Sequence, residues 1–285
     1  AGKRATILFD GAMSHANVYI NGQKVGYWPY GYNSFHFDIT KYLKPGEKNT
    51  LAVRLENLPE SSRWYPGAGL YRNVHLIVTE DAYIPVWGTY ITTPSVNEKF
   101  AKVNVLTKVV LPEGADPAKY SVETSVWNPN KQKLTAVRTS LAQMKYNNDQ
   151  AEQEFVIQDP SLWSPEMPAL YSAETRLYEG DKLKDVYTTP FGIRSIEIIP
   201  DKGFFLNGKR TVFKGVCNHH DLGPLGAAVN DAAIRRQIRI LKDMGCNAIR
   251  TSHNMPAPEL IRACDEMGMM IMAESFDEWN VAKCK

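Results

Sequence analysis

Apolar and polar residues alternate through the first two thirds of the chain, which is the pattern of strands with one buried face. Residues 35–39 read Phe-His-Phe-Asp-Ile, and a second alternation places Val103, Val105 and Val109 on one side of a strand. Turns such as Asn21-Gly22 separate the runs, since Asn-Gly supplies the two positive φ angles of a tight hairpin. We therefore predict an all-β jelly-roll sandwich over residues 1–82. An immunoglobulin-like sandwich without a disulfide should follow over residues 83–195.

Beyond the two sandwiches, short strands alternate with helices. After a hairpin around Asn207-Gly208, we expect a strand from Thr211 to about residue 217 and further strands over 247–251 and 269–273. The last strand is continuously apolar, as expected for a strand covered on both faces. The helices between them carry two apolar faces, Ile234, Ile238, Leu241, Met244 and Leu260, Ile261, Cys264, Met267.

The helix ends support this division of the chain. Asn230 or Asp231 is placed to cap the first helix, and Gly245 and Gly268 to end the two helices. Strand–helix–strand units of this kind indicate a parallel sheet. We predict the first three or so units of a (β/α)8 barrel over residues 196–285.

Polar side chains follow each of the three strands at its carboxyl end. Residues 218–221 read Asn-His-His-Asp, residues 252–254 read Ser-His-Asn, and Glu274 follows the third strand. A β/α barrel keeps its active site at this edge. His220, His253 and Glu274 are therefore the main candidate site residues, with Asn218 and Asn254 beside them. The alternative for Ser252 and Asn254 is that they cap the helix that follows.

A nucleotide site and a metal site are the two alternatives to consider at these strand ends. The glycine spacings of dinucleotide-binding and phosphate-binding loops are absent from the sequence. A divalent metal site has the right side chains in His219, His220, Asp221, His253 and Glu274. However, neighbouring residues on a strand point to opposite faces, so His219 and His220 would not converge on one ion. We favour a carbohydrate site, because Asn, His and Asp side chains can each bond a sugar hydroxyl.

Composition narrows the possible partners. The net charge is +2 with Lys and Arg scattered along the chain, which argues against nucleic acid and anionic membrane partners. No apolar run approaches the roughly 20 residues of a membrane span. The four cysteines form no C-x-x-C pair, so we expect free thiols rather than a zinc site or disulfides.

The chain opens Ala1-Gly2 without an initiator Met. We expect a processed chain or a piece of a longer one, periplasmic or secreted if a signal peptide was removed and cytoplasmic otherwise.

An ordered set of motifs resembles glycoside hydrolase family 2, and its β-galactosidase branch in particular. The matching stretches are residues 10–11, 17–22, 62–74, 163–165 with 168–171, 191–194, 205–209, 215–221 and 247–253. The resemblance implies retaining hydrolysis of terminal β-glycosides. It also implies that His220 and His253 line the sugar subsite and that Glu274 lies on the active-site floor. Asn57 and Arg63 match positions where the first domain approaches the site. No cofactor is implied, although a structural Mg or Na ion is possible in a full-length member, as is a homo-oligomer.

The sequence departs from the family pattern in its catalytic residues. A retaining glycosidase needs two carboxyl groups, and in this family both are glutamates, the acid/base following an Asn. The one Asn-Glu pair of this chain, Asn97-Glu98, falls in the second sandwich. We therefore expect both glutamates beyond Lys285 and predict that this chain alone does not hydrolyse a β-galactoside. The alternatives are a non-catalytic carbohydrate-binding or scaffold module, or a barrel completed by another polypeptide. Galactosides, glucuronides and mannosides all remain open as substrates.

Overall fold

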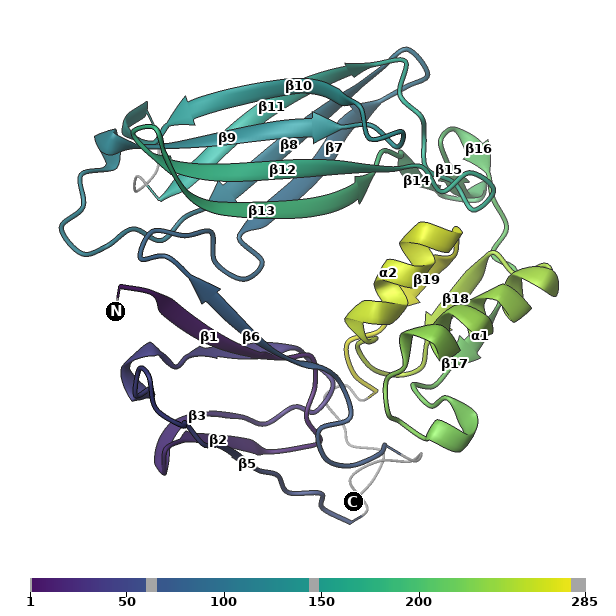
Figure 1. The fold of residues 1–285 in the computed structure, drawn as a ribbon. Helices are drawn as coiled ribbons and strands as arrows, with labels where there is room; N and C mark the ends of the chain where they lie inside the picture. The colour runs from purple at the N-terminus through teal and green to yellow at the C-terminus, as the bar shows by residue number, and fades with distance from the viewer. Residues whose placement is uncertain (1, 60–65, 144–148, 278–285) are drawn as a thin grey trace. The chain divides into compact units, whose positions relative to one another are not determined.

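The computed structural model describes residues 2–59, 66–143 and 149–277. The chain forms two compact units. The first unit joins Lys3–Val78 to the segment from Phe213 onward, and the second comprises Thr79–Val212. Figure 1 shows the strands and helices of each unit along the chain.

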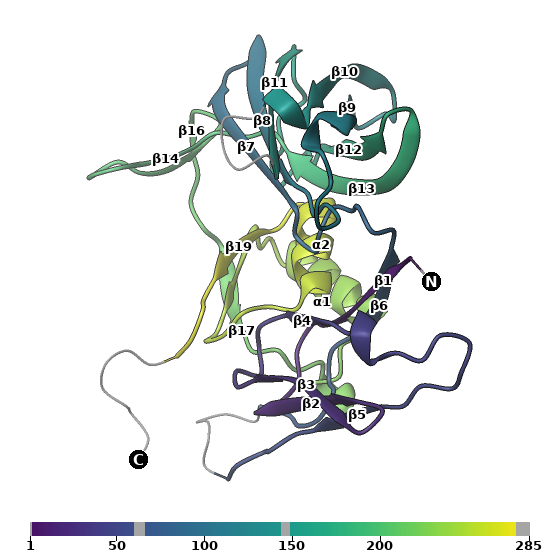
Figure 2. The same ribbon diagram turned by 90° about the vertical axis from the view of Figure 1, so that its left-hand side faces the viewer.

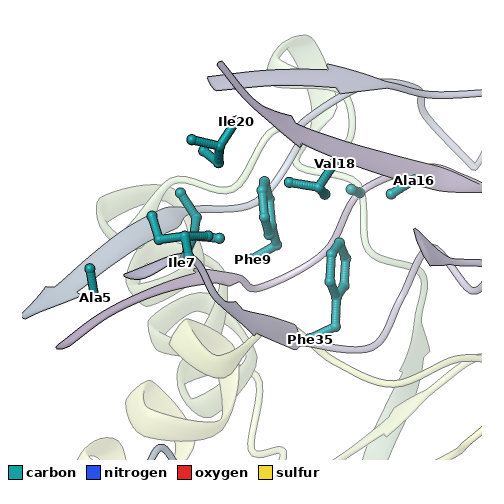
Figure 3. Packing of buried hydrophobic residues seen from close by; sticks show 9 residues of the cluster. Ala5, Ile7, Phe9, Ala16, Val18, Ile20 and Phe35 are labelled. Atoms are coloured by element: carbon teal, nitrogen blue, oxygen red, sulfur yellow. The ribbon is translucent and has the colours of Figure 1, made fainter. Parts of the chain in front are cut away.

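The first unit begins with a β-sandwich of two three-stranded sheets, in the orders β4-β1-β6 and β3-β2-β5. Its strands are β1 (Arg4–Phe9), β2 (Ala16–Ile20), β3 (Gln23–Trp28), β4 (Phe35–Asp38), β5 (Leu51–Arg54) and β6 (Val74–Thr79), with the 3₁₀ turn η1 (Thr40–Tyr42) after β4. Every second residue of β1 is buried, as the alternating sequence predicts. Figure 3 shows Phe9 and Phe35 between the sheets, with their rings stacked 4.9 Å apart. Asn21 and Gly22 turn between β2 and β3 with φ angles of 51° and 79°, which confirms the predicted hairpin.

The second unit is dominated by a sandwich of a four-stranded sheet, β10-β9-β12-β13, and a three-stranded sheet, β11-β8-β7. These strands are β7 (Thr89–Val96), β8 (Phe100–Lys108), β9 (Tyr120–Trp127), β10 (Lys133–Ser140), β11 (Gln150–Gln158), β12 (Leu170–Glu179) and β13 (Lys182–Gly192), with the 3₁₀ turns η2 (Pro117–Lys119) and η3 (Leu141–Gln143). The antiparallel pairing and two-sheet core are those of the predicted immunoglobulin-like sandwich. A small sheet follows, made of β14 (Ile196–Ile199), β15 (Gly203–Leu206) and β16 (Lys209–Arg210). The turn at residues 207–208 is the predicted hairpin.

The chain then returns to the first unit as a β/α layer. The strands β17 (Gly215–Asn218), β18 (Ala248–Thr251) and β19 (Met270–Ala273) pair in parallel in the order β17-β18-β19. The 3₁₀ turn η4 (Gly223–Leu225) follows β17, and helices α1 (Asp231–Asp243) and α2 (Pro258–Met267) connect the strands. Figure 1 and Figure 2 show the two helices side by side against the same face of this sheet. This is the predicted start of a (β/α)8 barrel.

The helix ends follow from local chemistry. Asn230 is the N-cap of α1, and its side chain accepts a hydrogen bond of 3.0 Å from the amide of Ala233. Gly245 and Gly268 follow the two helices with φ angles of 87° and 74°, where residues with a Cβ would be strained. Within the described residues, no helix has the length and apolar character needed to cross a bilayer.

Three details of the β/α layer differ from the sequence prediction. Strand β17 begins at Gly215 rather than Thr211, because its neighbour β18 begins only at Ala248, opposite Gly215. Met244 is 68% exposed, since α1 ends one residue earlier and the partly buried Cys246 packs on the core instead. Ile261 stands at the margin of the packed face of α2 and is exposed.

Strand β19 was also predicted to be covered on both faces, and this is wrong for the described residues. Ile271 packs toward the helices, but Met272 points the other way and is 55% exposed. The reason is that both helices lie on one face of the sheet. The opposite face of β17-β18-β19 is therefore open among the described residues.

Candidate functional site

Alternation along the three parallel strands sorts the site residues onto two sides. Val216, Ile249 and Ile271 stand opposite one another in register and pack against the helices. The next residues, Cys217, Arg250 and Met272, therefore project from the other face, which in a complete barrel is the interior. We call Cys217, His219, Arg250, His253 and Glu274 the barrel-face cluster.

The Glu274 carboxylate is the centre of the barrel-face cluster. Its Oε1 accepts a hydrogen bond of 2.5 Å from Nε of Arg250. Its Oε2 lies 2.8 Å from Nδ1 of His253. The amide of Glu274 also donates to Oγ1 of Thr251 at 3.1 Å. A carboxylate engaged by two side chains, on a residue whose backbone amide is also held, has a fixed position and orientation.

Two further side chains complete the cluster. The His219 ring meets the His253 ring edge-on, with centroids 5.9 Å apart and an interplanar angle of 85°. The Cys217 thiol lies 3.6 Å from Nη1 of Arg250. His219 and Cys217 are both exposed. The cluster thus presents imidazole groups at a surface where a ligand can approach.

Hydrogen bonds from Arg250 and His253 favour the ionised form of the Glu274 carboxyl group. Burial alone would raise the pKa of Glu274, but hydrogen bonds from His253 and Arg250 outweigh it and hold that pKa below its usual value. The hydrogen bond from Arg250 likewise lowers the pKa of the Cys217 thiol. Glu274 is therefore an ionised hydrogen-bond acceptor at neutral pH.

The other candidate residues line a cavity behind the strands, which we call the Arg72 cavity. Asn218, His220 and Asn254 line it together with His219 of the cluster and with Tyr71 and Arg72 of the loop before β6. Its empty volume, with its mouth included, is about 510 Å³. The Arg72 cavity lies within the first unit, where the loop before β6 meets the β/α layer.

Arg72 holds these two parts of the first unit together. Its side chain donates to the carbonyl oxygen of Tyr32 in the sandwich at 2.6 Å and to that of Met255 in the β/α layer at 2.8 Å. It is only 4% exposed, and burial lowers the pKa of its guanidinium. Asn73, the next residue, donates to the buried Glu259 of α2. The join between sandwich and layer is therefore polar and directional.

His220 is the contact of the β17 loop with the sandwich. Its Nε2 lies 2.8 Å from the carbonyl oxygen of Pro66, so Nε2 carries the proton and donates. The ring packs edge-on against Tyr32 and Tyr71, with centroids 5.0 and 6.0 Å away. Burial lowers the pKa of His220. The surroundings of this ring are thus those of a neutral imidazole.

The remaining sequence candidates have different surroundings. Asn254 is buried and donates to the carbonyl oxygen of Met255 at 3.1 Å. Neither Asn254 nor Ser252 caps α2, whose N-cap is Ala257 without a side-chain hydrogen bond. Asn57 is exposed in the loop after β5. Arg63 lies outside the described residues.

Sequence reasoning missed His219 and Arg250. The sequence predicts that His219 and His220 diverge and favours His220 for the site; in the structure the ring of His219 contacts that of His253. The signal was present, because the apolar Val216 marks the helix-facing side of the strand and so assigns Cys217 and His219 to the opposite side. Arg250 lies within β18, and its sequence position gives no sign of the contact with Glu274.

The donor set does not fit a metal ion. Among the described residues, no group of three or more His, Cys, Asp and Glu side chains is arranged to hold one. Both oxygens of Glu274 already accept from Arg250 and His253.

Replacing Arg72 should destabilise the first unit. Arg72→Met keeps the length of the side chain but removes the 2.6 Å donor of the buried Tyr32 carbonyl and the closer of the two donors of the Met255 carbonyl. We expect a loss of at least about 2 kcal/mol in the free energy of unfolding, measured by urea titration. The control is Arg54→Met, which removes an ion pair with Glu56 from a side chain that is 68% exposed and should cost less than about 1 kcal/mol. Equal effects of the two variants would contradict this assignment.

His220 should make stability depend on pH. Its pKa is lowered on folding, so the unfolded chain binds more protons between that folded pKa and the ordinary value of about 6.5. Stability should therefore fall as the pH drops from about 7 through this window. Subtracting the unfolding free energies of His220→Gln from those of the wild type at each pH isolates this contribution, because His36, whose pKa is also lowered, is present in both. A difference that does not change between pH 7 and pH 5 would refute the prediction.

Comparisons with known proteins agree with this architecture. The model of the sugar binding domain of glycosyl hydrolases family 2 matches residues 1–80, that of glycosyl hydrolases family 2 matches 83–194, and that of the family's TIM barrel domain matches 197–282. The beta-galactosidase BoGH2A of Bacteroides ovatus is 45% identical over 284 residues, covering 99% of this chain and 33% of that protein. A putative beta-glucuronidase of Formosa agariphila is 40% identical, covering 98% of this chain and 26% of that protein.

Solved structures show the same fold. A family 2 member from Bacteroides cellulosilyticus superposes with a TM-score of 0.93 at 36% identity, covering 100% of this chain and 36% of that one. A beta-glycosidase from Bacteroides vulgatus gives a TM-score of 0.90 at 36% identity, over 99% and 35% of the two chains. The chain thus spans about a third of the length of such relatives. With a sugar binding domain, an immunoglobulin-like domain and the first part of a TIM barrel in the family's order, the chain belongs to glycosyl hydrolases family 2.

Proposed function

We propose that the barrel-face cluster forms one wall of the sugar site of a retaining glycosidase that acts on terminal β-galactosides or related β-glycosides. The observation that carries the proposal is the convergence of His219, His253 and Glu274 at the carboxyl ends of parallel strands. The printed names of the relatives, beta-galactosidase and beta-glucuronidase, support the substrate class.

The chemistry of the cluster suits a sugar hydroxyl. An imidazole ring nitrogen can donate to or accept from a hydroxyl, according to whether it carries a proton. The rings meet at a right angle, so their nitrogens point in different directions, as the hydroxyls of a pyranose do. Asn218, His220 and Asn254 line the Arg72 cavity, which His219 of the wall also borders.

The same cluster is unsuited to breaking a glycosidic bond. Retaining hydrolysis needs one protonated carboxyl group and one carboxylate nucleophile about 5–5.5 Å apart. The barrel-face cluster contains one carboxylate, Glu274, whose lowered pKa keeps it ionised and whose oxygens are engaged by Arg250 and His253. We propose that both catalytic glutamates belong to later barrel strands and that this chain does not hydrolyse glycosides by itself. In isolation it would act as a non-catalytic carbohydrate-binding module, the second candidate function.

Galactose binding tests the sugar wall directly. Titrating galactose into the ¹⁵N-histidine-labelled chain should shift the imidazole signals of His253 and His219, with weak affinity because one wall makes few contacts. His253→Ala should abolish the shift of His219. The matched control, His75→Ala, removes an imidazole of the sandwich that pairs with Asp10 and should leave it intact. Unchanged cluster signals at saturating sugar would argue against the wall.

Hydrolysis assays test whether the catalytic glutamates lie outside this chain. The chain alone should show no turnover of a chromogenic β-galactoside. A chimera that joins it to the remaining sequence of the Bacteroides ovatus enzyme should be active. Within that chimera, His253→Ala should lower kcat/KM by at least about tenfold, because a hydrogen bond to substrate is lost. Enzyme-like turnover by the chain alone, or full activity of the variant chimera, would overturn the assignment.

A further inference from the structure

Two contacts besides the one with His253 fix the position of Glu274. Its amide donates to Thr251 Oγ1, and its Oε1 accepts from Nε of Arg250 at 2.5 Å. Arg250 itself projects from the middle of β18, in register with Cys217 and Met272. With backbone and Oε1 both held, the second oxygen, Oε2, is directed at Nδ1 of His253 at 2.8 Å. The carboxylate therefore has a defined partner for each oxygen.

The contact with Glu274 decides which nitrogen of His253 carries the proton. An ionised carboxylate only accepts hydrogen bonds, so a 2.8 Å contact requires a proton on Nδ1. Nη2 of Arg250 also approaches Nδ1, at 3.3 Å, and as a donor it would favour the opposite tautomer. The carboxylate contact is shorter by half an ångström and joins the nitrogen to a negative charge, so it prevails.

We propose that Glu274 is a positioning residue that fixes His253 in the Nδ1–H tautomer, so that its Nε2 presents a lone pair to a sugar hydroxyl that donates. This inference rests on the proposed sugar-binding function for the identity of the ligand. The tautomer itself is a property of the chain without sugar. Arg250 is the second member of this arrangement, because it determines which oxygen of Glu274 faces the ring.

The geometry predicts the effect of one isosteric change. In Glu274→Gln, Arg250 still needs an oxygen to accept from its Nε, so the side-chain amide should orient its oxygen toward Arg250 and its NH₂ group toward His253. An NH₂ group donates, and it therefore requires a lone pair on Nδ1. The substitution should reverse the tautomer of His253, moving the proton to Nε2.

The experiment is a two-dimensional ¹⁵N–¹H spectrum of the ¹⁵N-histidine-labelled full chain at pH 8, without sugar. The ring nitrogens of the six histidines are recorded, and those of His253 are assigned by their loss in His253→Gln. We expect Nδ1 to be the protonated nitrogen in the wild type and Nε2 in Glu274→Gln. A wild-type His253 protonated at Nε2, or a Glu274→Gln spectrum with the wild-type tautomer, would overturn the inference.

Two control variants separate positioning from general structural damage. Glu266→Gln changes another carboxylate paired with an arginine, Arg235 of α1, and should leave His253 unchanged. Arg250→Lys keeps Glu274 ionised and should retain the Nδ1–H tautomer, which gives a second reading should Glu274→Gln fail to fold. Loss of the tautomer in Arg250→Lys with Glu274 intact would count against the carboxylate as its cause.

Sugar binding is measured separately. If the wild type has the Nδ1–H tautomer, Glu274→Gln should weaken galactose binding by about tenfold. The reason is that Nε2 of His253, which faces the hydroxyl, changes from acceptor to donor. Absence of galactose binding in a wild type that has the Nδ1–H tautomer would contradict the proposed function while leaving the positioning role in place. Full galactose affinity in a variant with the reversed tautomer would contradict the lone-pair role of Nε2.

Discussion

The buried guanidinium of Arg72 is the interaction on which the first unit depends. A charged group that is 4% exposed is costly unless its N–H groups are satisfied. Here carbonyl oxygens from both the sandwich and the β/α layer accept from it. Because the two parts are far apart in sequence, with the second unit inserted between them, such directional bonds define how loop and layer meet. The position of His220 against Pro66 follows from that join.

Strand alternation then divides the chemistry of the unit. A strand residue faces either the helices or the opposite side of the sheet, and the two sides differ in burial. On the helix side, Asn218 and His220 lie in the Arg72 cavity, and the pKa of His220 is lowered by burial. His219 also borders that cavity, but it is exposed and its ring meets that of the partly exposed His253, next to the ionised Glu274. The adjacent residues His219 and His220 thus have unlike surroundings.

The electrostatics of the barrel face also explain the character of the proposed site. Glu274 is balanced by Arg250 and oriented toward His253, so its charge organises neighbouring groups instead of acting on a substrate bond. A wall of this kind binds and orients. Its chemistry suits the proposed sugar wall, and the proton transfers of hydrolysis need other carboxyl groups.

The sequence by itself determined the three-part architecture, the hairpins at Asn-Gly, the Asn230 cap and the strand ends at which His253 and Glu274 meet. These features are local, since period, turn residues and caps act over a few positions. Only the tertiary structure decided that His219 and not His220 faces His253, that Met272 is exposed, and that Arg250 links β18 to Glu274. The physical reason is that the helices cover one face of the sheet and the sandwich supplies partners for His220. Such partners come from residues distant in sequence, and no local pattern encodes them.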